Sequence, residues 1–572
     1  MKIRNRFNAE VRAAVGSALA ELGWQDEEFQ TEASDMADLA VPCFAMAKTR
    51  RLPPKEIAAR IADKVTVGGT VAAVEAVNGY LNFTIDPAML VESTLTEIVE
   101  RGDDYGSLPA KGIKINVEHT STNPTGPIHV GRARNPIIGD TLSRCLARCG
   151  YEVETEYYVN DVGKQVVILT WGIDNIPDGE VERKEERDKP DHRLVANYRH
   201  ANRMMEEDED VRERISEMLR RFEAGDAEVI GSVRRTTELM LDGLKETLSE
   251  INVVLDRYTW ESDFIADGSA RDVVERLKTS EYAGQADDGA WYLDLESFGI
   301  RGKNTKFTFT RSDGTTLYTT RDLAYHLDKF RRADEAVNVL GEDQKLGSKQ
   351  LCSALQILGS EKMPDPMFYS FVSLPEGKMS TRRGVVVYLD DLIDEAVSRA
   401  YDEIRKRRSD LPEERMRGIA RQIGIGAIRY NIVRVSPDKQ LVFRWEDALN
   451  FDGNSGPYLQ YVHARACSML RKAGEYNYDC DPGMLTDEYE IRLVRALAGF
   501  EEALYRAGEQ RKVNTIPAYG HEVASAFNQF YAAVPVLAAG ENRDARLTLV
   551  ECTRTVLKNV LDCLGMEAPE EM

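Results

Sequence analysis

Two short segments carry residue types that could hold a phosphorylated ligand. In the first, His129 and Gly131 follow a turn rich in proline and glycine, and a helical pattern begins directly after them. Because a helix leaves its first amides unpaired and has a positive dipole at this end, an anion can bind where glycine removes the side chain. The second segment, residues 376–384, is basic and bracketed by glycines, and it contains Lys378. Together the two segments predict a nucleotide site.

Three polar clusters follow predicted strands, at the strand ends where open α/β sheets bind ligands. The clusters are Glu118, Asn123 and His129; Tyr318 and Asp322; and residues 341–344. If they converge on one crevice, they form a pocket suited to a guanidinium, whose planar fork pairs with a carboxylate through two hydrogen bonds. A lysine would leave buried acceptors unpaired there, at about 1–3 kcal/mol per group. The alternative is that Asp322 caps a helix and Glu118 pairs with a surface arginine, and the sequence leaves both open.

The elements that would position these residues belong to a layered α/β domain. Residues 113–117 alternate apolar and polar side chains, as a strand does, and residues 138–149 repeat with helical spacing. Further strands alternate with helical segments, which predicts a doubly wound parallel sheet. The charge-dense residues 178–228 indicate an insertion of solvated helices, and the second half of the sheet is expected to resume at residues 306–317.

The two ends of the chain have patterns of their own. A small α+β unit is predicted at the start, where Asn78 and Gly79 give a strong hairpin signal between two β-rich runs. Amphipathic helices are predicted for nearly every segment from Pro457 to Met572. We expect three domains: residues 1–100, an α/β domain at 101–452 with an insertion at about 155–300, and an all-α bundle at 453–572.

The composition is that of an ordinary globular protein of several domains. The 572 residues are 42% hydrophobic and 30% charged, and we find no signal-peptide pattern and no apolar run long enough to span a bilayer. We therefore expect a cytoplasmic protein with no membrane partner. Eight scattered cysteines without a Cys-x-x-Cys pair predict neither a zinc or other metal site nor disulfides. The net charge of −22 argues against a nucleic-acid partner, because an acidic protein repels phosphates as a whole. It does not exclude local stripes of basic residues that bind nucleic acid.

The two phosphate-binding segments resemble the paired signatures of class I aminoacyl-tRNA synthetases, in which a histidine-rich turn and a lysine loop grip ATP from opposite halves of a Rossmann-type fold. The Tyr318–Asp322 segment and the C-terminal block from Phe451 to Arg465 extend the resemblance along nearly the whole chain to arginyl-tRNA synthetases of the archaeal type. The resemblance implies ATP-dependent ligation of L-arginine to tRNA(Arg) through arginyl-adenylate, with release of AMP and pyrophosphate. Mg²⁺ is expected with ATP, and a monomer is expected.

The resemblance also implies roles for individual residues. Catalysis would involve His129, Gly131, Arg132 and Lys378. ATP would be held by His129, Gly131, Lys378, Met379 and Ser380. Arginine would be held by Glu118, Asn123, His129, Tyr318, Asp322 and Gln344. The D-loop of tRNA would meet Asn78, Tyr80 and Asn82, and the anticodon would meet Tyr458, Tyr461, Arg465, Tyr531 and Met572, because aromatic rings and arginine bind unpaired bases.

Two positions depart from the class I signatures. Arg132 stands where a second histidine is usual, and Thr381 stands where a second lysine is common. Two rival interpretations follow: another class I synthetase or related nucleotidyl transferase, and a non-catalytic tRNA-binding paralogue. Tyr318 with Asp322 and the C-terminal block favour arginine as the substrate, and the joint presence of His129 and Lys378 favours catalysis.

Overall fold

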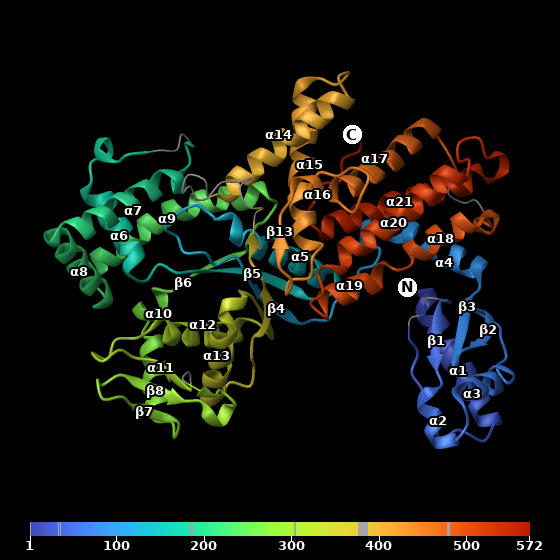
Figure 1. Ribbon diagram of the computed structural model, residues 1–572, viewed down its shortest axis with the longest axis horizontal. Coiled ribbons are helices and arrows are strands. Elements are labelled where there is room, and N and C mark those ends of the chain that lie inside the picture. The colour runs from blue at the N-terminus through green and yellow to red at the C-terminus, as the bar shows by residue number, and fades with distance from the viewer. Residues whose placement is uncertain are drawn as a thin grey trace.

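The structure is a computed structural model that describes residues 2–32, 34, 36–183, 187–302, 305–373, 375, 387–477 and 481–572. Figure 1 shows a central sheet flanked by an insertion of helices on the left, a helical bundle on the upper right and a small N-terminal unit on the lower right. Among the described residues, no helix combines the length and the apolar character needed to cross a bilayer.

The N-terminal unit packs helices against one antiparallel sheet. Its elements are α1 (Lys2–Glu21), β1 (Leu39–Pro42), α2 (Phe44–Arg50), α3 (Pro54–Ala62), β2 (Val71–Val77) and β3 (Tyr80–Ile85), with strand order β1-β3-β2. Asn78 and Gly79 connect β2 to β3 with φ angles of 53° and 91°, the left-handed conformation that a two-residue hairpin turn requires. The predicted hairpin is confirmed. Helix α4 (Pro87–Arg101) then packs against the C-terminal bundle.

The central sheet has five parallel strands in the order β11-β10-β4-β5-β6. The strands are β4 (Lys114–Glu118), β5 (Glu152–Val159), β6 (Arg257–Trp260), β10 (Glu335–Gly341) and β11 (Asp365–Tyr369). Three helices connect them: α5 (Arg134–Arg148), α12 (Tyr318–Arg332) and α13 (Lys345–Ile357). The strand order reverses between β4 and β10, so a ligand crevice is expected outside the carboxyl ends of these two strands.

Two groups of elements interrupt the sheet. The first is the helical group α6 (Lys164–Asn175), α7 (Pro190–Glu207), α8 (Glu209–Glu223) and α9 (Ala227–Glu250). The second comprises α10 (Asp263–Ala266), α11 (Ser269–Lys278) and the antiparallel sheet of β7 (Ala283–Gln285), β8 (Trp291–Asp294) and β9 (Lys306–Thr308). The prediction that the parallel sheet resumes at residues 306–317 is wrong, because β9 pairs antiparallel with β8 and the parallel sheet resumes only at β10. Strand β6 lies within the range predicted as an insertion and β5 overlaps the start of that range, but both strands belong to the central sheet.

The C-terminal part is helical apart from one short strand pair. Strand β12 (Val372–Ser373) pairs with β13 (Leu441–Val442) beside the hairpin of α14 (Leu389–Arg407) and α15 (Glu413–Val433). The remaining helices are α16 (Trp445–Ala448), α17 (Gly456–Ala473), α18 (Glu488–Leu497), α19 (Phe500–Gly508), α20 (Thr515–Ala533) and α21 (Arg543–Cys563). One hydrophobic core runs through the N-terminal unit, the central sheet and this bundle, so the three pack as one body.

Candidate active site

The histidine-containing turn forms a short 3₁₀ helix, η2 (Val130–Arg132), before α5 begins. The backbone N–H of Gly131 donates to Nδ1 of His129 at 2.9 Å, so this amide is satisfied within the turn rather than open to a phosphate. A Cβ atom at Gly131 would lie 3.0 Å from Nδ1 of His129, which explains the glycine. Partial burial and the charge of Arg132 lower the pKa of His129, so the exposed ring is neutral at neutral pH.

The backbone after the second signature segment runs beside this turn. Val130 donates to the carbonyl of Val387 at 3.0 Å, and Leu389 donates to the carbonyl of Ile128 at 2.8 Å. Lys378, Met379 and Ser380 lie outside the described residues. The described flank of their segment is therefore hydrogen-bonded to the turn that carries His129.

Glu118 and Asp322 are joined by a chain of three side chains. Glu118 ends β4 opposite Asn338 of β10, and Nζ of Lys329 donates to Oε2 of Glu118 at 2.7 Å and to Oδ1 of Asn338 at 3.0 Å. Nδ2 of Asn338 lies 2.7 Å from Nε2 of His326. The Nδ1 atom of His326 lies 2.8 Å from the carbonyl oxygen of Asp322 and 3.1 Å from its Oδ1. The two carboxylates thus lie on the same side of the molecule.

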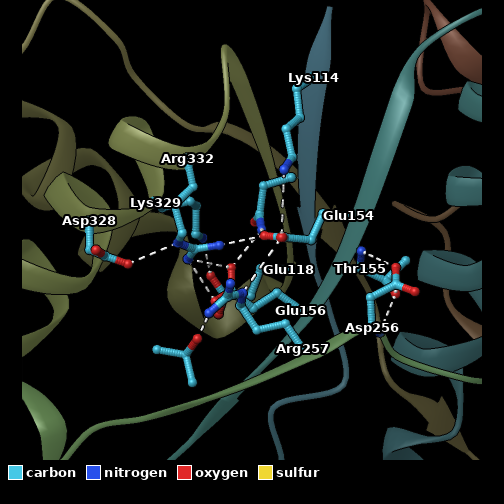
Figure 2. Close-up of polar contacts among 12 residues, drawn as sticks. Lys114, Glu118, Glu154, Thr155, Glu156, Asp256, Arg257, Asp328, Lys329 and Arg332 are labelled. Atoms are coloured by element: carbon cyan, nitrogen blue, oxygen red, sulfur yellow. Dashed lines mark hydrogen bonds and ion pairs between the residues drawn. The ribbon is translucent and has the colours of Figure 1, made fainter.

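Further charged side chains lie next to this chain, and Figure 2 shows them together. Arg332 donates to Glu154, to Glu156 at 2.8 Å and to Asp328 at 2.9 Å. Burial alone would raise the pKa of Glu156, but the charges of Lys329 and Arg332 outweigh it and lower that pKa. The cations of α12 therefore keep the buried acid ionised beside Glu118.

The sequence analysis missed a third carboxyl group, that of Glu261, which directly follows β6 and is 2% exposed. Burial raises its pKa to about 7 against the opposing charge of Arg321, and Asp161 and Asp322 raise it further. The hydroxyl of Tyr158 is buried without a hydrogen-bond partner among the described residues. After burial, the charges of Glu261, Asp322 and Glu118 raise its pKa, and the charge of Arg321 opposes them. The position of Glu261 at a strand end was the available signal, but that stretch had been assigned to the insertion.

The other predicted arginine ligands lie on the surface. Asn123 is exposed and donates to Gln165 at 3.3 Å, Tyr318 is 69% exposed at the start of α12, and Gln344 is exposed at the end of the 3₁₀ helix η6 (Glu342–Gln344). Within the described ranges, no hydrogen bond joins any of the three to Glu118 or Asp322. Asn123 is held by Gln165 and Asn160 on the surface, so the structure does not bring these three side chains together with Glu118 and Asp322.

The chain matches known proteins along its whole length. Residues 94–445 match the family described as "tRNA synthetases class I (R), catalytic domain", residues 459–572 match the "DALR anticodon binding domain", and residues 2–85 match the "Arginyl tRNA synthetase N terminal domain". The arginine--tRNA ligase of Methanocella arvoryzae is 48% identical over 97% of both chains. The chain belongs to the arginyl-tRNA synthetase family.

Other members of the arginyl-tRNA synthetase family agree with this assignment. The arginine--tRNA ligase of Methanothermobacter thermautotrophicus is 41% identical over 98% of this chain and 99% of its own. The arginyl-tRNA synthetase of Thermus thermophilus superposes with a TM-score of 0.82 at 28% identity, covering 98% of this chain and 99% of that one. The fold of the family is therefore shared from end to end.

In this member of the arginyl-tRNA synthetase family, the residues predicted to face the anticodon gather at one place on α17 and α20. Arg465 donates to the Tyr461 hydroxyl at 2.8 Å and to Asn528 at 2.6 Å, and Asn528 donates to the Tyr458 hydroxyl at 2.9 Å. The guanidinium carbon of Arg465 lies 5.0 Å from the ring centre of Tyr531. Two adjoining cavities of about 400 and 340 Å³ are each lined by Tyr461, Arg465 and Met572.

The N-terminal candidates of this synthetase-family chain differ in exposure. Asn78 lies in the β2–β3 turn, and Tyr80 packs edge-on against Phe44 with ring centres 5.0 Å apart. Asn82 is only 8% exposed, and its Oδ1 accepts a hydrogen bond from Ser34 at 3.1 Å. Asn82 therefore points into the unit, and the turn and Tyr80 are the more accessible part of the predicted D-loop contact.

One buried group of acids and a histidine has the ligand types of a metal site. Asp191, His192 and Asp390 bring ligand atoms within 4.8 Å of one another. However, Nζ of Lys189 lies 2.8 Å from Oδ1 of Asp390 and 3.2 Å from Oδ2 of Asp191. An ammonium thus fills the place of a cation, and the group anchors α7 to the start of α14.

Proposed function

We propose that this protein ligates L-arginine to tRNA(Arg) in two steps at the crevice between β4 and β10. The carboxylate of arginine attacks the α-phosphate of ATP, which gives arginyl-adenylate and pyrophosphate. A hydroxyl of the terminal ribose of tRNA then takes the arginyl group, and AMP leaves. ATP enters with Mg²⁺ on its phosphates, as is usual for nucleotide substrates. Such chemistry depends on placing the reacting groups in line and stabilising the charge on the phosphate oxygens, and side chains need not form covalent bonds to the substrates.

His129 is proposed as a neutral hydrogen-bond donor to the ATP phosphates. Its Nδ1 accepts from Gly131, so the ring proton is on Nε2, which is the atom left to meet a ligand. Arg132 adds a permanent cation next to it, in place of a second histidine. Gly131 supports the phosphate site indirectly, because its N–H and its missing side chain hold the His129 ring in place. Lys378, Met379 and Ser380 are proposed as further ATP ligands.

The arginine side chain is proposed to bind among Asp322, Glu261 and Glu118. The observation that carries this proposal is the hydrogen-bonded chain from Glu118 to Asp322, and the charges of the three carboxyl groups, which all raise the pKa of the buried Tyr158 hydroxyl, agree with it. A guanidinium can pair with carboxylates through its rigid fork, whereas an ammonium leaves acceptors unpaired. Asn123, His129, Tyr318 and Gln344 are proposed as polar neighbours of the bound amino acid.

The tRNA is proposed to contact both ends of the chain. Tyr458, Tyr461, Arg465, Tyr531 and Met572 would meet the anticodon, and Asn78, Tyr80 and Asn82 would meet the D-loop. The exposed rings of Tyr461 and Tyr531 beside Arg465 suit stacking of unpaired bases. Such stacking would offset the repulsion between tRNA phosphates and a protein with a net charge of −22. A monomer in the cytoplasm is proposed.

The Asp322→Ala variant tests the arginine pocket. Loss of a charged hydrogen-bond partner should raise the KM for arginine about 10- to 100-fold, while the KM for ATP changes little. Arginine-dependent pyrophosphate exchange, with and without tRNA, measures both constants. The matched control is Asp334→Ala, which removes an exposed aspartate just after the same helix. Equal effects on both substrates would remove Asp322 from the pocket, and a wild type without any exchange would favour a non-catalytic tRNA-binding protein.

A further inference from the structure

Lys329 is a fully buried lysine whose ammonium contacts Glu118 directly and is linked to Asp322 through Asn338 and His326. Its side chain is 0% exposed, and Nζ donates to Glu118 at 2.7 Å and to Asn338 at 3.0 Å. The same nitrogen lies 4.3 Å from the ring centre of Tyr325, one turn earlier on α12. Two acceptor oxygens and one ring face therefore account for the three N–H bonds of the ammonium. Figure 2 shows Lys329 and Glu118 within the surrounding charges.

The ammonium also fixes the direction of every hydrogen bond that leads to Asp322. A lysine can only donate, so the amide oxygen of Asn338 must face it and the amide nitrogen must face His326. Nε2 of His326 is then an acceptor, and the ring proton lies on Nδ1. That proton points at Asp322, whose carbonyl oxygen and carboxylate lie 2.8 and 3.1 Å away.

The geometry of the elements makes this arrangement rigid. Asp322, His326 and Lys329 repeat on one face of α12, and Asn338 and Glu118 are register partners on neighbouring strands. Among the described residues, the carboxylate of Glu118 has one hydrogen bond, from Lys329 to Oε2, which leaves Oε1 for a ligand. A shift of α12 along the sheet would break the contact of Lys329 with Glu118 and that of His326 with Asn338 at once.

We infer that Lys329 is a positioning residue for amino-acid selection: it holds Glu118 directly, and Asp322 through Asn338 and His326, at the span that an arginine side chain requires. The inference rests on the proposed arginine site and deepens it. Without the ammonium, a buried Glu118 would lose the one hydrogen-bond partner that it has among the described residues, and its carboxylate would turn toward water. Arginine would then lose an ionic contact, and the span between the carboxylates would no longer be fixed.

The Lys329→Met variant tests this inference, because methionine keeps the length of the side chain and removes the charge. The KM for arginine should rise about 10- to 100-fold, while the KM for ATP and the exchange rate at saturating arginine stay within about threefold. The matched control is Lys362→Met, since Lys362 also donates to the end of α12, to the carbonyls of Phe330 and Ala333, but is 43% exposed. An unchanged or lower arginine KM in Lys329→Met would overturn the inference.

A second variant keeps the test decisive if Lys329→Met does not fold. In Asn338→Leu the new side chain has nearly the shape of asparagine, and the ion pair of Lys329 with Glu118 is retained. The substitution removes the hydrogen bond to His326. It should raise the arginine KM about 5- to 20-fold without changing the KM for ATP. In the double variant with Asp322→Asn, the fold-increase in the arginine KM should be smaller than the product of the two single increases, because both substitutions act on the same contact. Full additivity would overturn the proposed path.

Failure of this inference can be told apart from failure of the proposed function. If the wild type shows no arginine-dependent exchange, or if Asp322→Ala leaves the arginine KM unchanged, the arginine site itself is wrong and the role of Lys329 falls with it. If the wild type and Asp322→Ala behave as expected while Lys329→Met and Asn338→Leu match the Lys362→Met control, the site stands and only the positioning role is overturned.

Discussion

Glu261 is a buried carboxyl group whose ionisation depends on what binds beside it. Burial raises its pKa to about 7, even though Nε of Arg321 lies 2.5 Å away and opposes the shift. This carboxyl group therefore titrates close to neutral pH, well above the ordinary range of a glutamate. A bound guanidinium favours the ionised form, so arginine binding should release a proton, and binding should weaken as the pH falls below 7.

The pH dependence of arginine binding tests this residue. Between pH 8 and pH 6 the KM for arginine should rise by up to about tenfold per pH unit below the pKa, because the neutral acid cannot pair with the cation. Glu261→Gln should bind arginine more weakly and flatten this profile. The KM for ATP over the same range is the internal control, and calorimetry in two buffers counts the proton released. An equally steep profile in Glu261→Gln would assign the proton to another group.

At the scale of single elements, the start of α5 is fixed by one buried cation. Arg134 is fully buried and donates to the carbonyls of Ser370, Val435, Ser436 and Lys439 at 2.6–3.0 Å. Burial lowers its pKa to about 10, so the guanidinium is still charged at neutral pH. These bonds hold the helix against the ends of β11 and α15, and they thereby place the turn of His129 beside the crevice.

Arg134→Met should destabilise the protein strongly, because it removes the donor of the Ser370, Val435 and Lys439 carbonyls, whereas the Ser436 carbonyl still accepts from the N–H of Lys439. We expect a loss of about 3–5 kcal/mol in the free energy of unfolding, measured by urea titration. The control is Arg399→Met, which breaks an exposed pair with Glu395 on α14 and should cost about 0.5 kcal/mol or less. Similar losses for both variants would show that the carbonyls find other donors.

The sequence patterns predicted where strands and helices form better than they predicted which strands and side chains pair with one another. Alternation found β4, and the Asn78–Gly79 signal found the hairpin, because both signals are local in the chain. The residues around Phe307 alternate equally well, but alternation does not say which sheet a strand joins, and β9 joined the small one. The pairing of Lys329 with Glu118 could not be predicted, since an ion pair between distant elements leaves no periodic signal.

At the scale of the whole molecule, Arg429 joins segments that are far apart in sequence. Its side chain is 0% exposed, and it donates to Asp140 of α5, to the carbonyl of Ile251 after α9 and to the carbonyl of Leu564 after α21. Gly565 lies directly against it with φ at +62°, and a Cβ there would lie 2.2 Å from Nη2 of Arg429. The insertion, the sheet and the C-terminal bundle therefore meet at one guanidinium.

Gly565→Ala should disturb this junction in two ways, through the positive φ and through the clash with a side chain that has no room to move. We expect a loss of about 2–4 kcal/mol in unfolding free energy. Gly540→Ala isolates the first effect, because Gly540 has φ of +59° and open space around its Cβ position; it should cost about 1 kcal/mol. Urea titration of both variants measures the difference between their losses of unfolding free energy. Equal losses would mean that the clash with Arg429 costs no stability.

The backbone bonds of Ile128 and Val130 with Val387 and Leu389 also bear on how the chain is made. The partners are separated in sequence by most of the sheet and both groups of inserted elements, so closing this contact carries a large loop entropy and a high contact order. A nascent chain that has emerged only as far as β11 has the five strands of its central sheet but not yet the segment that pairs with the turn of His129. We therefore expect this turn to be completed late in synthesis, after the start of α14 has left the ribosome.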